Sequence, residues 1–207
     1  MINDLSGIGI YYKQDMDVLT KGVAMIIGPK DSVYANCLLF FKFDFPSDYP
    51  FQPPTVTFLT HDGKTRFHPN LYRDGKVCLS ILGTYSGPSW QSTMSFSMIL
   101  LSLKTLLDKN PLNHEPGYET TPLTHTYALH YSLYVQYHIV KYTVNELIQR
   151  VYLHIFEHDI PHVLPQLKEN LKTTITEQRN AKVDDYYPHV PYNMSGHIAW
   201  ATLNLPV

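Results

Sequence analysis

Four prolines fall within nine residues, in the segment from Pro46 to Pro54. Each proline fixes its own φ and lacks the backbone N–H that a sheet ladder needs, so the segment is predicted to be a stiff, irregular loop. Runs rich in β-branched and aromatic residues flank it at 36–45 and 55–59, and a third run, 23–27, ends at Gly28-Pro29. Three strands with short connections predict an antiparallel meander.

The region between residues 92 and 110 predicts a buried helix. Ser92 or Thr93 is suited to cap its N-terminus, and Asn110-Pro111 is suited to end it. The residues that approximate one apolar helical face are Met94, Met98, Leu101, Leu103 and Leu106.

Beyond Pro122 the chain changes character, because residues 123–160 contain no glycine or proline. Apolar residues recur there at helical spacing, which predicts two helices or one broken helix. These residues are Leu133, Tyr137, Val144, Ile148, Val151 and Ile155. Leu164, Leu167, Leu171 and Ile175 indicate another amphipathic helix. The tail, 183–207, is too irregular to assign.

Length and composition predict one globular domain with an extension, since the chain has 207 residues and is 44% hydrophobic. The net charge is -2, and Lys and Arg are scattered, so we expect no nucleic-acid partner. The apolar runs are too short to span a bilayer, and residues 1–25 lack a signal-peptide pattern, so we expect no membrane partner. We expect an intracellular protein in the cytoplasm, with a nuclear location left open.

The two cysteines, Cys37 and Cys78, are too few for a secreted disulfide scaffold. Cys37 lies inside an apolar strand, which favours a buried thiol. Cys78 stands between Val77 and Leu79, and by itself it also fits a small buried hydrophobe. Its wider surroundings favour a nucleophile instead.

His68-Pro69-Asn70 places its asparagine eight residues before Cys78, in a Val-Cys-Leu setting. This pattern resembles the active-site signature of ubiquitin-conjugating enzymes. The loop from Tyr49 to Pro54, Gly28-Pro29 and Trp90 match the same family. The resemblance covers about residues 5–120.

Residues 75–90 and 113–119 are similar to the Z type of that family, and hybrid conjugating enzyme-ligases share parts of the pattern. The resemblance implies an α+β fold, in which an antiparallel meander sheet is backed by helices. It implies a conjugating core domain at 1–120 and a helical C-terminal extension with an irregular tail at 121–207. It also implies no cofactor and no metal.

The family chemistry is acyl transfer between thiols and amines, for which a thiolate is both a nucleophile and a good leaving group. The resemblance makes Cys78 that nucleophile. Asn70 would donate to the tetrahedral oxyanion, or it would close the turn after Pro69; both roles are open. His68 is expected to be structural, with a Cys–His dyad as the alternative.

An attacking lysine must lose a proton, and counting from Trp90 places His114 near the expected position, with Glu115 next to it. Either side chain would orient or deprotonate the amine; a solvated loop pair is the other interpretation. The tyrosine common before His-Pro-Asn is Phe67 here, so its hydroxyl is missing.

The sequence departs from the family pattern in two segments that, in the family, contact the ligase and the activating enzyme. Phe58 matches a ligase-contacting position and also fits a core residue, while residues 90–93 lack the proline of the second ligase loop. The family begins with a basic amphipathic helix, whereas here Met1–Leu5 precede Ser6 and no Lys or Arg occurs before Lys13. We expect the activating enzyme to bind other surfaces, or a segment to be lacking.

The sequence therefore predicts a ubiquitin-conjugating enzyme. It would accept ubiquitin or a ubiquitin-like modifier from an activating enzyme on Cys78 and pass it to a lysine or a ligase. Two rivals remain: a modifier-binding adaptor without turnover, and a cysteine hydrolase that uses Cys78 and His68. His154, His158 and His162 recur every four residues, but Pro161 interrupts them and no further ligand has metal spacing.

Overall fold

The structure is a computed structural model that describes residues 4–181 and 185–206. Its main sheet has four strands in the order β1-β2-β3-β4, and every neighbouring pair is antiparallel. The meander and α+β class are confirmed, although β1 was not predicted. The strands are β1 (Ile10–Gln14), β2 (Lys21–Ile27), β3 (Leu38–Asp44) and β4 (Thr55–Phe58).

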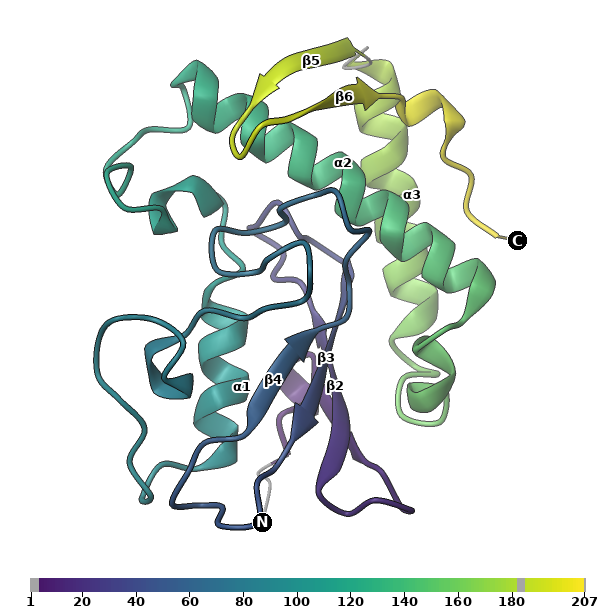
Figure 1. Cartoon of the computed structure of the whole chain (residues 1–207). Coiled ribbons are helices and arrows are strands. Elements are labelled where there is room, and N and C mark those ends of the chain that lie inside the picture. Colours follow the sequence, from purple (N-terminus) through teal and green to yellow (C-terminus); the bar gives the residue numbers. More distant parts are fainter. Residues whose placement is uncertain (1–3, 182–184, 207) are drawn as a thin grey trace.

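One face of the sheet packs against α1 (Phe96–Thr105), which lies along it in Figure 1. Phe43 of β3 meets Phe96 edge to face, with ring centroids 4.9 Å apart. Phe41 lies beside Phe58 of β4 on the same face, at 5.3 Å. These buried aromatic rings form the centre of the core.

The opposite face of the sheet is covered by α2 (Thr126–Gln149) and the 3-10 turn Leu153–Phe156. Phe40 of β3 packs against Phe156, with ring centroids 6.2 Å apart. The Leu38 N–H donates to the Thr143 hydroxyl of α2 at 3.1 Å, so a residue far along the chain satisfies a buried strand group. The sheet is therefore sandwiched between helices.

The helix α1 begins at Phe96, later than predicted, and its predicted buried face is wrong in part. Met98 and Leu101 are 45% and 39% exposed. Phe96, Ile99 and Leu100 are buried instead, beside the correctly predicted Leu103. Because apolar residues occur all around this helix, spacing alone could not choose the face that meets the sheet.

The single long helix α2 replaces the predicted pair or broken helix over much of 123–160. Tyr137 and Val144 are buried as predicted, whereas Ile148 is 55% exposed and Val151 is 50% exposed. The chain leaves the helix at Arg150, which has a left-handed φ of 57°. That turn accounts for the exposure of Val151, which follows it, whereas Ile148 lies within α2 on its exposed side.

The second extension helix, α3 (Leu164–Asn180), buries Leu167, Leu171 and Ile175, as the sequence predicted. The unassigned tail contains a hairpin, β5 (Asp185–Val190) paired antiparallel with β6 (Met194–Ile198). This hairpin lies against α2 at the top of Figure 1. The remaining 3-10 turns are Ser6–Ile8, Ser80–Leu82, Pro111–His114 and Trp200–Thr202.

The extension shares one continuous apolar core with the sheet and α1. Tyr131 and Val135 of α2 are fully buried in that core. The extension therefore packs against the preceding region, while a domain boundary at residue 120 stays a prediction. Within the described residues, no helix combines the length and apolar character that crossing a membrane requires.

Candidate active site

Asn70 and Cys78 face each other across a tight loop. The Cys78 N–H donates to the Asn70 carbonyl at 2.8 Å, and the Asn70 side-chain amide donates to the Cys78 carbonyl at 2.7 Å. Leu71 and Val77 form the next bridge of this loop. Gly75 turns the chain with a φ of 89°, and a Cβ there would lie 2.9 Å from the Phe58 carbonyl, so only glycine fits.

Cys78 forms no disulfide with the other described cysteine, and the residue is 4% exposed. Thr84 supports the main chain on both sides of it. The Thr84 hydroxyl accepts from the Leu79 N–H at 3.0 Å and donates to the Val77 carbonyl at 2.7 Å. The loop after Cys78 is thereby folded back onto the residues that flank Cys78.

His68 is fully buried and accepts the Asn70 N–H at Nδ1, at 3.0 Å. Burial, followed by the nearby His114 and Arg66, holds the pKa of His68 well below its usual range; the Leu106 carbonyl acts in the opposite direction. A neutral ring that accepts at Nδ1 carries its proton on Nε2. This ring therefore orders the backbone before Asn70.

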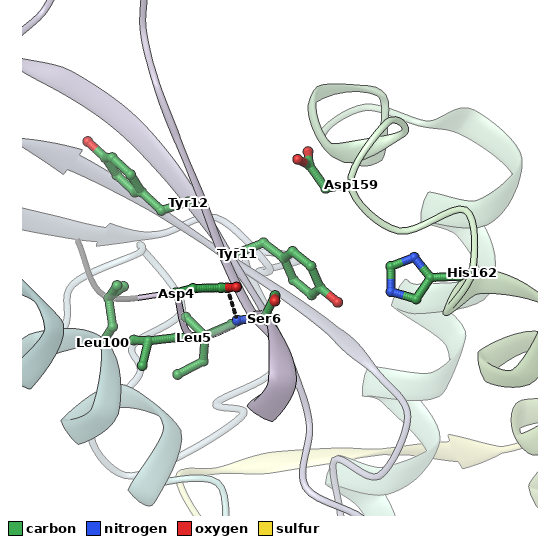
Figure 2. A pocket seen from close by; sticks show the side chains of 9 residues that line it. Asp4, Leu5, Ser6, Tyr11, Tyr12, Leu100, Asp159 and His162 are labelled. Carbon is green, nitrogen blue, oxygen red and sulfur yellow. Dashed lines mark hydrogen bonds between the residues drawn. The ribbon is translucent and has the colours of Figure 1, made fainter. Parts of the chain in front are cut away.

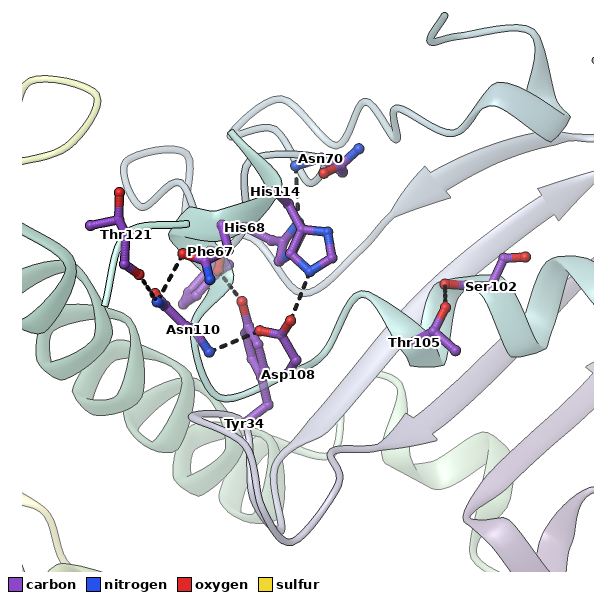
Figure 3. A network of polar contacts seen from close by, with 11 residues as sticks. Tyr34, Phe67, His68, Asn70, Ser102, Thr105, Asp108, Asn110, His114 and Thr121 are labelled. Carbon is purple, nitrogen blue, oxygen red and sulfur yellow. Dashed lines mark hydrogen bonds and ion pairs between the residues drawn. The ribbon is translucent and has the colours of Figure 1, made fainter. Parts of the chain in front are cut away.

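The ring of His114 lies beside that of His68 at a tilted angle of 57°, with ring centroids 4.7 Å apart (Figure 3). Its Nε2 lies 2.9 Å from Asp108 Oδ2, and its side chain is 29% exposed. Figure 3 shows a network around these rings, in which the Tyr34 hydroxyl donates to the Phe67 carbonyl at 2.6 Å. Asn110 adds a bond to the Thr121 carbonyl at 2.8 Å.

Two candidate residues from the sequence lie in the core. Cys37 is fully buried, and burial raises the pKa of its thiol to about 12. Phe58 is also fully buried, so the expectation that it offers an exposed ligase contact is wrong, and its alternative as a core residue is confirmed. The reason is strand register: Phe58 lies opposite Phe41 on the α1 face of the sheet.

A separate hollow of about 370 Å³ lies between the N-terminal segment, β1, α1 and the turn before α3. Figure 2 shows Asp4, Asp159 and His162 around it. Asp159 pairs with Lys13 at 2.9 Å. None of the residues that line this hollow belongs to the Cys78 loop or the His68 network.

Among the described residues, no group of three or more His, Cys, Asp or Glu side chains is placed to hold a metal ion.

Comparison with known proteins places this geometry in a family. The sequence model described as "Ubiquitin-conjugating enzyme" matches residues 3–135, which is more than half of the chain. The chain belongs to the ubiquitin-conjugating enzyme family.

Relatives within the family support the predicted Z-type resemblance. "Ubiquitin-conjugating enzyme E2 Z" from Xenopus tropicalis is 46% identical over 112 residues, which is 54% of this chain and 36% of that protein. The human "Dual E2 ubiquitin-conjugating enzyme/E3 ubiquitin-protein ligase BIRC6" is 43% identical over 120 residues, 55% of this chain and 2% of that protein. The chain thus spans about a third or less of these relatives' length.

Among solved structures, the human ubiquitin-conjugating enzyme E2 G1 is 30% identical. The alignment covers 50% of this chain and 80% of that chain, with a TM-score of 0.42.

For this family member, the structure joins Asn70 to both His68 and the main chain of Cys78, and it places the His114 ring beside that of His68. Sequence reasoning missed Thr84, whose hydroxyl supports Cys78 across a loop of the matched segment. It also missed Tyr192, which reaches the site from the C-terminal hairpin. A threonine in a Gly-Thr turn gave a weak local signal, while nothing local marks Tyr192.

Proposed function

We propose that this chain is a ubiquitin-conjugating enzyme that carries ubiquitin or a ubiquitin-like modifier as a thioester on Cys78. The modifier would come from an activating enzyme and pass to a lysine or to a ligase. Family membership supports this activity, and the observation that carries it is the reciprocal pair of hydrogen bonds between Asn70 and Cys78. That pair fixes the backbone of the nucleophile next to an amide donor.

The contacts support the following roles as part of this proposal. Cys78 attacks the activating enzyme's thioester and takes over the acyl group, releasing that enzyme's thiol. Asn70 then donates to the oxyanion as an amine attacks, since its amide has a second N–H beyond the one bound to the Cys78 carbonyl. His68 positions Asn70, and His114 or Glu115 orients the incoming amine.

The proposed function also assigns a role to each of the two parts of the chain. Residues 1–120 would carry out the transfer, and the extension, 121–207, would contribute to the choice of modifier or activating enzyme. The family match runs past this boundary to residue 135, inside α2. The proposed location is the cytoplasm, with a nuclear location left open.

A modifier-binding adaptor is the second candidate, and one observation favours it: Cys78 is only 4% exposed, whereas a nucleophile must be reached. A charging assay separates the two. The chain is incubated with ATP and a panel of activating enzymes and modifiers, then resolved with and without reductant.

We expect an adduct that requires ATP and activating enzyme and that reductant removes. Modifier binding without such an adduct would establish the adaptor. Cleavage of a modifier conjugate without ATP or activating enzyme would indicate the hydrolase rival. The Cys78→Ser variant is the matched control, because a serine adduct resists reductant.

A further inference from the structure

The tip of the β5–β6 hairpin rests on the segment that leads to Asn70. Tyr192 and Asn193 form the turn, with left-handed φ values of 65° and 54°. The Arg66 N–H donates to the Met194 sulfur at 3.1 Å, and the Arg73 guanidinium donates to the Tyr192 carbonyl. The hairpin is thus attached at both ends of the His68–Asn70 segment.

The ring of Tyr192 helps to hold the Arg66 side chain. The Arg66 guanidinium lies 3.1 Å from the Tyr72 ring centroid and 5.0 Å from that of Tyr192. This guanidinium donates to the His68 carbonyl at 3.1 Å and also to the Pro69 carbonyl. Arg66 therefore fixes the two peptide groups directly before Asn70.

The hydroxyl of Tyr192 makes a different contact. It donates to Glu115 Oε2 at 2.7 Å, across to the loop that also carries His114. Burial, with Tyr131 and the Glu115 carboxylate adding to it, raises the pKa of Tyr192, so the phenol stays a neutral donor. One side chain from the C-terminal hairpin thus links the loop of Asn70 to the loop of Glu115.

We propose that Tyr192 is a positioning residue for modifier transfer, so that part of the extension belongs to the active site. Its ring sets the Asn70 backbone through Arg66, and its hydroxyl orients the Glu115 carboxylate toward the acceptor amine's side of the site. This inference rests on the proposed conjugating activity. Small displacements of such groups matter, because a misplacement of about 1 Å can cost roughly 10²-fold in rate.

The test is single-turnover discharge of preformed thioester to free lysine, measured over a range of lysine concentrations. Tyr192→Leu removes the ring and the hydroxyl, while Tyr192→Phe removes only the hydroxyl. Tyr186→Leu is the matched control, since Tyr186 lies on the same hairpin and is 48% exposed. Charging rate and melting temperature are measured for each variant.

We expect Tyr192→Leu to lower the maximal discharge rate about tenfold or more, within the range set by misplaced catalytic groups, while charging stays within about twofold. Tyr192→Phe should restore the maximal rate but raise the KM for lysine, as Glu115→Ala should. Combining Tyr192→Phe with Glu115→Ala should add no further rise, because the Tyr192 hydroxyl acts on the KM only through Glu115.

Normal discharge kinetics in Tyr192→Leu, or a loss equal to that of Tyr186→Leu, would overturn the role of Tyr192. A loss of charging that matches the loss of discharge would reduce it to a structural contact and overturn the role equally. If the unaltered chain forms no thioester with any modifier, the proposed function fails and this role fails with it. The outcomes that overturn only the role of Tyr192 leave the proposed function intact, because the unaltered chain still forms its thioester.

Discussion

The side-chain amide of Asn70 donates to the Cys78 carbonyl at 2.7 Å, and the loop that joins the two residues turns at Gly75. In the resting structure one donor of Asn70 therefore stabilises the backbone of the nucleophile. The amide has two N–H groups, so this bond does not use up its capacity to donate. The turn-closing and oxyanion roles can coexist in one residue.

Replacing Asn70 by alanine tests how these roles divide. We expect Asn70→Ala to accept modifier but to discharge it to lysine roughly 10²–10³-fold more slowly, the usual effect of losing an oxyanion donor. Loss of the bond to the Cys78 carbonyl should also cost about 1–3 kcal/mol in the free energy of unfolding. Discharge kinetics and denaturant unfolding are measured together.

A control for that variant is Thr60→Val, which leaves the buried Phe40 N–H without the Thr60 hydroxyl that accepts from it at 2.7 Å, away from the Cys78 loop. It should lose comparable stability while its discharge rate stays near that of the unaltered chain. If both variants slow discharge in proportion to their stability loss, Asn70 acts only in closing the turn.

The two cysteines should differ sharply. We expect Cys78→Ser to form a slow adduct that resists reductant, because an ester replaces the thioester, and Cys37→Ser to charge nearly normally. Cys37 is fully buried with a pKa raised to about 12, so it is neither accessible nor ionised. Non-reducing gels read out charging. A Cys37→Ser variant that folds by circular dichroism yet fails to charge would contradict the assignment.

Buried neutral histidines should make the fold sensitive to acid. Burial lowers the pKa of His138 to about 4, although Asp62 opposes the shift and Lys141 adds to it; His68 is shifted in the same direction. A folded pKa below the unfolded value of about 6.5 means that the unfolded chain binds more protons, so stability falls as the pH drops below about 6.5. Each histidine contributes at most about 1.4 kcal/mol per pH unit.

This dependence is measured by denaturant unfolding between about pH 7.5 and pH 4.5, a window set by the two pKa values of His138. The His138→Gln variant cannot titrate, so its stability should fall less steeply on acidification than that of the unaltered chain. His154→Gln, a change at an exposed histidine, serves as the control and should leave the slope unchanged. Identical slopes for His138→Gln and the unaltered chain would show that folding does not lower the pKa of His138.

The extension should be needed for folding itself. Truncation after Thr121 removes α2, whose Tyr131 and Val135 are fully buried, and uncovers the face of the sheet that holds Phe40. Exposed apolar surface costs about 25 cal/mol per Å², so we expect loss of cooperative unfolding rather than a modest fall in melting temperature. Calorimetry checks this. A soluble 1–121 fragment with a sharp transition and normal charging would contradict it.

A smaller change probes the same interface. Thr143→Val keeps the shape of the side chain but leaves the buried Leu38 N–H without its hydroxyl partner, which should cost about 1–3 kcal/mol. Thr176→Val, on the exposed side of α3, is the matched control and should change the unfolding free energy by less than about 0.5 kcal/mol. Equal stabilities for the two variants would show that the Leu38 contact adds nothing.

Local features of the sequence determined much of this protein. The proline loop, three of the strands and the apolar face of α3 follow from turn chemistry and periodicity, which act over a few residues. The link between Asn70 and Cys78 came from the resemblance of their spacing to a family signature, not from loop geometry. The resemblance to a family added the chemistry of the thiol.

Only the tertiary structure decided the rest. Contacts between segments distant in sequence decided three features. They are the buried face of α1, the packing of Phe156 over Phe40 and the position of Tyr192 beside Glu115. The spacing of apolar residues predicts which of them share a face of a helix or strand. It does not predict which face packs against another element of the fold. That choice is made by packing all apolar surfaces at once, so it exists only in the folded chain.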